Sequence, residues 1–436
     1  MDVSTVEFQL PSLALDGGFD GLRLEVEERC GAGRIPLRFA SVRTTPTGFV
    51  CEVEAITDPP AQVQEFPSIF QFRQRSGARG GSFNAVMIIP TGVDCAIGGH
   101  AGDATPAAKV LGAVCDTLVL HPNVVNASDI NEQPANALYV EGSLICRLMM
   151  GSIGLRTVRR NRVLLVTEAR DDGDKVLDQV VNCVSGARAT LGLDCPRVVV
   201  LAEGLEMQMA YATSGRATGR IGKLEGLVEL LVSQRDRYDA VALATRITSE
   251  MDSVELNLAY YHGEGANPWG GVEAALTHAL STVLDVPTAH APTLCHLGLL
   301  TAEFGQAEPR KAAEAISETF LFCVLKGLHN APRVIPPRDF HQPGELHAED
   351  LDVLVTPDGC IGLPVLAALV QGMTVIAVTE NTNLMRNDLD RLPWAPGQLI
   401  RVRSYFEAAG VLAAMKAGVD LTALDRPMAL TRVELT

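Results

Sequence analysis

The chain has 436 residues, which is enough for two or three domains with a sizeable core. Its 52 Asp and Glu outnumber its 36 Lys and Arg, and a net charge of -16 argues against a non-specific nucleic-acid binder, which is normally basic. The ten cysteines show no CxxC spacing, so we expect reduced thiols with neither a disulfide framework nor a zinc knuckle.

Hydropathy predicts where the protein resides. The first residues carry no basic segment followed by a long apolar core, and no apolar run reaches the ~18 residues of a membrane span. We therefore expect a cytoplasmic protein with no membrane partner. Hydrophobic residues form 47% of the chain, which favours a buried interface in a homo-oligomer.

The N-terminal part, residues 1–56, predicts a small β unit. Its expected strands are 6–10, 22–27, 37–42 and 49–55. The alternating pattern LRLEVEE supports the second of these strands, with one face in water. Residues 57–84 are polar and rich in Gly, Arg and Gln, which predicts a linker or flap.

From residue 85 onward, strand-like and helix-like runs alternate. Such alternation is typical of βαβ units with parallel sheets. We place a first α/β section at 85–250 and a second at 251–436. In the first section we expect strands 86–89, 117–120, 162–166, 198–201 and 240–244 and helices 106–114, 141–150, 175–191 and 221–235. In the second we expect helices 271–284, 309–328, 364–371 and 405–417, strands 352–355 and 375–378, and an edge strand within 427–436.

One internal similarity guides the fold prediction. Residues 354–381 repeat the plan of 85–126: an apolar strand, a Gly-rich turn, a helix opened by Pro and a second apolar strand. We therefore predict an α/β fold in which two Rossmann-like parallel-sheet sections face each other across a cleft. The alternative is that any two βαβ units look alike.

The loop GGHAGDATP at 98–106 is the first candidate site. Glycines allow the backbone to approach a ligand, and Thr105 before Pro106 predicts a helix start whose free N–H groups suit an anion. The alternative is a tight turn in which the polar side chains bind the backbone. We expect anion contacts from Gly98, Gly99 and Thr105, with His100 as acid–base and Asp103 orienting it or binding a metal.

A second candidate follows the strand 117–120. His121 ends that strand and is the other acid–base candidate, and Asn123 and Asn126 are substrate-binding candidates. If both early strands are parallel, His100 and His121 fall at one sheet edge, where open α/β folds bind ligands. The alternative is a solvated loop that uses Asn for turns.

Two further candidates lie between residues 260 and 296. In YYHGEGANPWGGVEAALTH, Glu273 is one of the polar residues around four glycines, and a ligand contact is expected from His262, Glu264, Asn267 and Trp269, since a tryptophan in a Gly loop can stack on a ligand. The alternative is a tryptophan that anchors the loop in the core, with His278 packed on the following helix. His290, between small residues and prolines, is a candidate ligand or general base.

The last candidate is TPDGCIGLP with the end of the following strand. Asp358, Gly359, Glu380 and Asn381 are its expected binding residues. Cys360 near a helix start is either a nucleophile or a small buried hydrophobe. Two arginine groups either hold an anion or form solvated faces: Arg156, Arg159, Arg160 and Arg162, and Arg216 with Arg220.

Four runs, PTGVDCAIGGHAGDATP, LHPNVVNASDINE, NPWGGVEA and TPDGCIGLPVLAAL, resemble the family known as domain of unknown function 3326. The resemblance covers about residues 85–381 and implies no activity, cofactor or site residue. The segment GLPVLAALVQGMTVIAV is also similar to the Gly-rich turn of nucleotide-sugar transferases and epimerases.

We expect an enzyme that acts on a small carboxylate- or phosphate-bearing metabolite, of lyase or isomerase type, with a histidine general acid–base. The cofactor is unknown; if a divalent metal is used, His, Asp and Glu ligation favours Mg²⁺, Mn²⁺ or Zn²⁺. GxSxG, HExxH and Lys-centred P-loop motifs do not occur. The alternatives are a nucleotide-sugar-type transferase or epimerase using 354–381, and a non-catalytic small-molecule binding protein.

Overall fold

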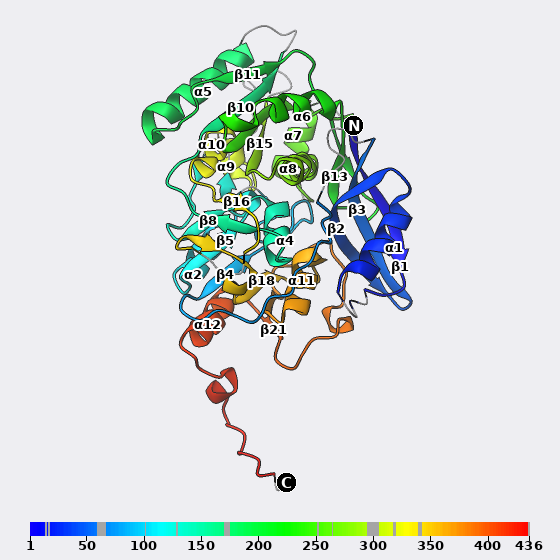
Figure 1. The fold of residues 1–436 in the computed structure, drawn as a ribbon, viewed down its shortest axis with the longest axis vertical. Helices are drawn as coiled ribbons and strands as arrows, with labels where there is room; N and C mark the ends of the chain where they lie inside the picture. The colour runs from blue at the N-terminus through cyan, green and yellow to red at the C-terminus, as the bar shows by residue number, and fades with distance from the viewer. Residues whose placement is uncertain are drawn as a thin grey trace.

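The computed structural model describes residues 1–13, 15, 18–58, 67–100, 102–127, 130–169, 175–250, 253–263, 265–293, 305–316, 320–338 and 342–434. These residues form three larger sheets with helices packed between and around them (Figure 1). The α/β class, the parallel sheets and the small N-terminal β unit expected from the sequence are confirmed.

The N-terminal unit is an antiparallel sheet with the strand order β12-β13-β1-β3-β2-β19. Its strands are β1 (Asp2–Leu10), β2 (Arg34–Thr45), β3 (Gly48–Thr57), β12 (Glu206–Tyr211), β13 (Ala217–Gly222) and β19 (Ile361–Gly362). The β12–β13 hairpin, which the sequence did not predict, adds to β1 from the middle of the chain. The sheet therefore collects segments that lie far apart in the sequence.

The expected strand at 22–27 is instead part of a helix, α1 (Asp20–Cys30). Leu22, Val26 and Cys30 are spaced by four and buried, whereas Leu24, which the alternating pattern placed on the same face, is 59% exposed. These residues form a helix because the spacing of four allows an apolar stripe to be buried against the sheet. Further along, residues 67–83 contain no helix or strand, but Ile69 and Phe70 are buried in the core beside Phe39.

A six-stranded parallel sheet has the order β21-β20-β18-β4-β5-β8. Its strands are β4 (Asn84–Met87), β5 (Thr117–Leu120), β8 (Ala137–Tyr139), β18 (Val353–Pro357), β20 (Thr374–Val378) and β21 (Leu399–Val402). The two similar stretches of the sequence meet here, because β18 pairs directly with β4. They are thus neighbours in one sheet and do not face each other across a cleft, since pairing satisfies the backbone groups of both buried strands.

A four-stranded parallel sheet has the order β11-β10-β14-β15 and joins strands from both sides of residue 250. Its strands are β10 (Val163–Glu168), β11 (Val198–Leu201), β14 (Ala240–Arg246) and β15 (Thr288–Thr293). The helices are α2 (Thr105–Gly112), α3 (Pro122–Val125), α4 (Gly142–Met149), α5 (Lys175–Leu191), α6 (Leu224–Ser233), α7 (Ser253–His262), α8 (Gly270–Leu284), α9 (Ala312–Ala315), α10 (Leu321–His329), α11 (Leu363–Gln371) and α12 (Tyr405–Lys416).

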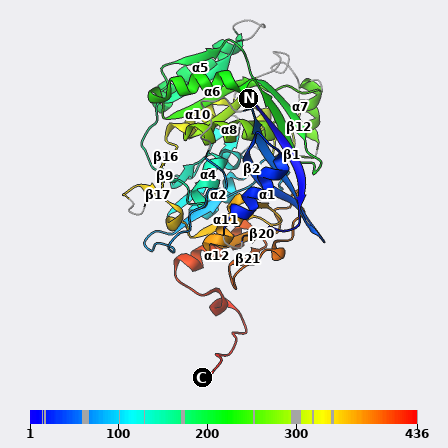
Figure 2. The ribbon, with the colours of Figure 1, turned by 45° about the vertical axis from the view of Figure 1, so that its right-hand side comes forward.

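Small elements complete the described part. They are the strands β6 (Asn126–Ala127), β7 (Ile130–Asn131), β9 (Gly154–Arg156), β16 (Arg333–Ile335) and β17 (Glu345–Leu346), and 3-10 turns at Arg235–Arg237, Ala348–Asp350, Leu389–Arg391 and Leu421–Leu424. The helix expected at 309–328 is seen as α9 and α10. The expected edge strand near the C-terminus is not formed within 427–434; in both views these residues run away from the body, with Leu430 93% exposed (Figures 1 and 2). Among the described residues, no helix is both long and apolar enough to span a membrane.

Helix α8 connects the sheets and positions the site. It packs against β13 of the antiparallel sheet, β15 of the four-stranded sheet, and α4. In Figure 1 it lies near the middle of the molecule, between β15 and β13. The approach to β13 is close: a Cβ on Gly271 would lie 2.3 Å from the backbone of Ala217. Glycine at this position lets the helix rest directly on the strand.

Candidate functional site

A cavity of about 310 Å³ lies beside α8, walled by residues of β2, β3, β15, α4 and α11 and by the loops after β4 and β5. Most lining side chains are apolar, with a smaller set of charged and polar groups among them. Cavities of this size and character are typical of small-molecule sites. One face of α8 contributes Gly270, Glu273, Ala274, Thr277 and His278, at the spacing of one helical stripe.

The charged part of the cavity centres on Glu54. This residue and Glu52 point to the same face of β3, and Glu54 is the register partner of Arg38 on β2. Glu54 Oε1 lies 3.2 Å from Arg38 Nη1 and 3.1 Å from Arg216 Nη1, and Glu54 Oε2 lies 3.1 Å from His278 Nδ1. Burial alone would raise the pKa of Glu54, but Arg38, His278 and Arg216 together hold that pKa well below its usual range. Glu54 is therefore a buried carboxylate anion.

The other nitrogen of His278 faces Glu141, with 3.5 Å between Nε2 and Oε1. Glu141 is held by the start of α4, because its Oε2 accepts the backbone N–H groups of Ser143 at 2.9 Å and Leu144 at 3.3 Å. The hydroxyl of Ser143 also donates to it. His278 thus lies between two carboxylates, and only a ring protonated on both nitrogens can donate to both.

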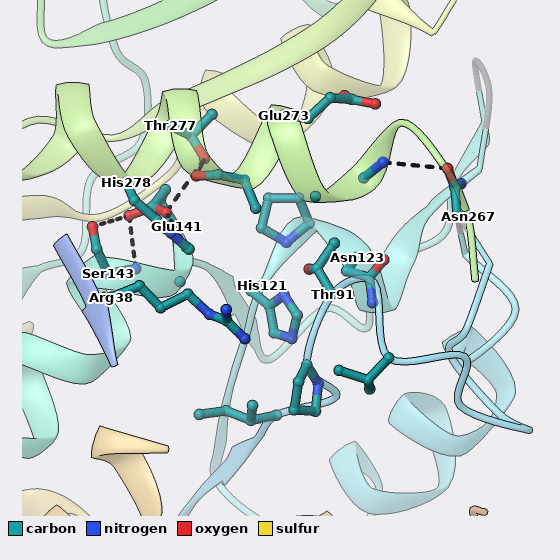
Figure 3. Close-up of a pocket in the computed structure, with 18 of the residues that line it drawn as sticks. Arg38, Thr91, His121, Asn123, Glu141, Ser143, Asn267, Glu273, Thr277 and His278 are labelled. Atoms are coloured by element: carbon teal, nitrogen blue, oxygen red, sulfur yellow. Dashed lines mark hydrogen bonds and ion pairs between the residues drawn. The ribbon is translucent and has the colours of Figure 1, made fainter. Parts of the chain in front are cut away.

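Arg38 presents unused donors to the cavity. Its side chain is 18% exposed, and only Nη1 is engaged, with Glu54. Nε and Nη2 of Arg38 have no hydrogen-bond partner within the described ranges. Neither belongs to the fully buried side-chain atoms that lack a partner. Figure 3 shows the guanidinium reaching from β2 toward the ring of His121. Because an arginine presents its N–H groups as a planar fork, this edge suits a carboxylate or phosphate.

His121 is a hydrogen-bond donor in this geometry. Its Nε2 accepts the N–H of Ile89 at 3.2 Å, so the proton of the neutral ring resides on Nδ1. Burial, with the charge of His278, lowers the pKa of His121 to about 4, and the Ile89 contact opposes this only partly. Near neutral pH the ring is therefore neutral, which favours donation from Nδ1 over the acid–base role expected from the sequence.

The pKa of His121 predicts acid sensitivity. Its value of about 4 lies below the 6.5 of an unperturbed histidine, so the unfolded chain takes up a proton first as the pH falls. Stability present above pH 6.5 is then lost between pH 6.5 and 4, and a pKa difference of about 2.5 corresponds to about 3 kcal/mol. In His121→Gln the side-chain oxygen still accepts from Ile89 but does not titrate.

The test is urea unfolding of both proteins at pH 7 and pH 4. We expect the free energy of unfolding of the wild type to fall by about 3 kcal/mol more than that of His121→Gln over this interval. The difference between the two proteins isolates His121, because every other titrating group is common to both. Parallel losses in the two proteins would contradict this assignment.

The structure brings these sequence-predicted candidates to the cavity: His121, Asn123, Asn126, Asn267, Trp269, His290, and also Arg216 and Cys360. The three amides are largely occupied within the protein. Asn123 Nδ2 donates to the carbonyl oxygens of Gly98 at 2.9 Å and Ile89 at 3.3 Å, and Asn126 Nδ2 donates to the Tyr139 hydroxyl at 2.6 Å. Asn267 Oδ1 accepts the N–H groups that open α8. These amides shape the wall, and Trp269 supplies an aromatic surface.

The Gly98 loop lies behind the cavity and does not line it. Its expected anion position is filled by the protein, because Asp103 accepts the N–H groups of Gly98 at 3.0 Å and His100 at 3.2 Å. Burial lowers the pKa of His100 to about 3 and raises that of Asp103 to about 6. Gly99 packs on the backbone of Cys95. The residue before α2 is Ala104, not Thr105, and the Thr105 hydroxyl donates to the Val124 carbonyl at 3.4 Å.

The remaining expected residues lie outside the cavity lining. Asn381 holds the loop before α2 through the backbone of Ile97, and Gly359 bonds Asn387. Asp358 and Glu380 lie near Arg401 and Arg403, at 3.7 and 4.0 Å. His262 is exposed at the end of α7, and Glu264 lies outside the described residues. Cys360 does line the cavity, but burial raises its pKa to about 12, which argues against a thiolate nucleophile.

Sequence reasoning missed Arg38, Glu54 and Glu141, named Glu273 only as one of the polar residues around the Gly-rich loop, and favoured a packing role for His278. One usable signal was the pair Glu52 and Glu54 in an otherwise apolar strand, opposite Arg38 across a tight hairpin. For the expected metal, no group of three or more His, Cys, Asp or Glu side chains in the described part of the chain is placed to hold an ion.

Comparison with known proteins gives the family. The model described as "Protein of unknown function (DUF3326)" matches residues 84–425, which confirms the resemblance seen in the sequence. An uncharacterised lipoprotein of Synechococcus sp. is 35% identical over 353 residues, covering 79% of this chain and 94% of that protein. No solved structure matches. The expected cytoplasmic location is wrong on this comparison: it rested on reading the first residues, whereas a relative aligned over most of both chains is named a lipoprotein.

Proposed function

The chain belongs to the family described as Protein of unknown function (DUF3326), and we propose that it is an enzyme acting on a small anionic metabolite in the α8 cavity, by lyase or isomerase chemistry. One observation carries the proposal: Arg38 presents the unpaired edge of its guanidinium to a largely apolar cavity, which His121 also lines. A buried cation with open donors attracts an anion strongly, because the surroundings screen its charge little.

The anion is held by two kinds of donor. Nε and Nη2 of Arg38 match the two oxygens of a carboxylate or two oxygens of a phosphate. The neutral His121 adds a single directed hydrogen bond from Nδ1 without changing its charge. Glu54 fixes Arg38 from the opposite side, so the guanidinium is oriented before the ligand arrives.

Proton transfer is assigned to His278. Glu54 orients the ring through Nδ1 at 3.1 Å, as a carboxylate does in catalytic dyads, and Nε2 is the nitrogen that gives or takes the proton. Glu141, 3.5 Å from Nε2, stabilises the protonated ring. Removal and return of a proton next to a carboxylate is the step that lyases and isomerases share. The apolar walls exclude water from it.

A non-catalytic binding protein is the second candidate. It is favoured by the name of the Synechococcus relative, a lipoprotein, because a protein attached to a lipid anchor can serve to capture a ligand. The nucleotide-sugar-type alternative has weaker support, since Asp358 and Gly359 do not line the cavity.

The binding step is tested with Arg38→Lys. Lysine keeps the positive charge but loses the fork, so we expect the dissociation constant for small carboxylates and sugar phosphates to rise by about tenfold, equivalent to about 1.4 kcal/mol. A thermal-shift screen finds the ligands, because a ligand at ~100 times its dissociation constant adds about 2.7 kcal/mol of stability. Calorimetry then measures both proteins.

Arg23→Lys is the matched control, because Arg23 lies on α1 and pairs with Glu27 at the surface. It should leave every dissociation constant unchanged. If no anion in the panel stabilises the wild type, or if Arg38→Lys binds as tightly as the wild type, the anion site is not at Arg38 and the proposal fails.

A further inference from the structure

We infer that the ligand of the α8 cavity is bipolar, carrying a cationic amino group at the end opposite its anionic group. The inference rests on the proposed function, because it assigns the second end of the same site. Glu273 is the residue that would receive the amino group. It lines the cavity from α8 and is 23% exposed, so it is neither sealed in the core nor a free surface side chain.

Glu273 keeps an open oxygen. Its Oε2 lies 3.1 Å from His290 Nδ1, and this is its sole recorded hydrogen bond within the described ranges. Oε1 of Glu273 has no hydrogen-bond partner within the described ranges, and it is not among the fully buried atoms. No Lys or Arg of the described residues pairs with it. A carboxylate in a mostly apolar cavity normally has a cationic partner, and no Lys or Arg of the described residues takes that place at Glu273.

His290 engages one of the two oxygens of Glu273. Its Nδ1 lies 3.1 Å from Oε2, and its Nε2 lies 2.9 Å from the Thr245 hydroxyl on the other side of the ring. The imidazole therefore leaves Oε1 of Glu273 available to a cationic group of a ligand.

The cations of the cavity lie at the other end. Arg38 and Arg216 are the arginines that line it, and both contact Glu54. Lys311 does not line the cavity, and its ammonium donates to the carbonyls of Tyr260 at 2.7 Å and Gly263 at 2.6 Å, at the end of α7. The cavity thus has arginine donors at Arg38 and a carboxylate without a Lys or Arg partner at Glu273.

The spacing along α8 gives the axial part of the separation between the two ends. Arg38 and His278 share Glu54, so both mark the anion end. Glu273 precedes His278 by five residues, which is about 7.5 Å along the helix axis. Figure 3 shows Glu273 on α8, well away from Arg38. The fitting class is therefore an ω-amino acid of about four to six carbons in total, which places about three to five methylene groups between its charged groups.

The experiment compares matched ligands by calorimetry on the full-length protein. The pairs are butyrate with 4-aminobutyrate and hexanoate with 6-aminohexanoate, and hexylamine alone tests the Glu273 end without Arg38. We expect the better amino acid to bind the wild type at least tenfold more tightly than its matched carboxylate. Glu273→Gln should abolish this preference, since its amide still accepts from His290 but has no charge. Glu273→Asp should retain part of it.

The outcomes separate the two proposals. If carboxylates bind through Arg38 but no amino group improves binding, the bipolar ligand is wrong and the anion site stands. If hexylamine binds the wild type but not Glu273→Gln while no carboxylate binds, the amine end is supported and the proposed function fails. An amine preference that survives in Glu273→Gln overturns the inference. Unchanged thermal midpoints of the unliganded variants exclude misfolding as the cause.

Discussion

Replacing Arg216 with methionine should lower the free energy of unfolding by about 3–5 kcal/mol, the usual loss when one partner of a buried ion pair is removed. Arg216 is 1% exposed and binds two buried carboxylates, with Nε 2.5 Å from Glu52 and Nη1 3.1 Å from Glu54. Without it, Glu52 retains only the hydroxyl of Ser214 as a hydrogen-bonding side chain within the described residues. Methionine fills similar space, so the loss reports the uncompensated charge. Urea unfolding measures it.

Two comparisons make this result specific. Arg23→Met removes an exposed i,i+4 pair on α1 and should cost no more than about 0.5 kcal/mol. Adding Glu52→Gln to Arg216→Met removes the carboxylate that has lost its cation, since Glu54 keeps Arg38 and His278, and should restore part of the loss. If Arg216→Met costs less than about 1 kcal/mol, or if Glu52→Gln restores nothing, the carboxylates are not charged as described and the account of the cluster around Glu54 fails.

The sequence predicted the elements that depend on local signals. Helix α5 at 175–191 and strand β11 at 198–201 have the expected bounds, because an amphipathic period and a short apolar run are written into consecutive residues. His121 was found for a similar reason: it ends a buried strand and begins a loop, which is where α/β proteins place ligand contacts.

The rest of the site depends on tertiary contacts that no local pattern encodes. In the sequence, charges at alternate positions of a strand indicate a face in contact with water, but Glu52 and Glu54 are buried, and Glu54 contacts His278 of α8. Their partners Arg216 and His278 come from β12–β13 and α8, more than 160 residues away along the chain. The Gly98 loop had the composition of an anion site, but Asp103, five residues from Gly98, takes its N–H groups. The amino-acid composition of the Gly98 loop therefore predicted a turn correctly, whereas the position of the cavity depends on tertiary packing.

Replacing His278 with glutamine should slow proton transfer to a bound carboxylate by about 10²–10⁴-fold, the usual contribution of a general acid–base. The amide of glutamine still bonds to Glu54 but does not carry a proton from Nε2. The measurement needs no knowledge of the product: NMR follows exchange of hydrogen next to the carboxylate for solvent deuterium, using a ligand found through Arg38.

His329→Gln provides the control, because His329 lies on α10 outside the cavity lining and should exchange at the wild-type rate. A binding measurement separates catalysis from recognition. The dissociation constant of His278→Gln for the ligand should stay within about threefold of the wild-type value, since Arg38 and His121 hold the anion. A tenfold rise, equivalent to about 1.4 kcal/mol of binding free energy, would instead indicate a loss of recognition. Exchange in the wild type that persists at full rate in His278→Gln would move the acid–base elsewhere. Binding with no exchange in the wild type would favour the non-catalytic alternative, because a ligand would then be held at Arg38 with its protons untouched.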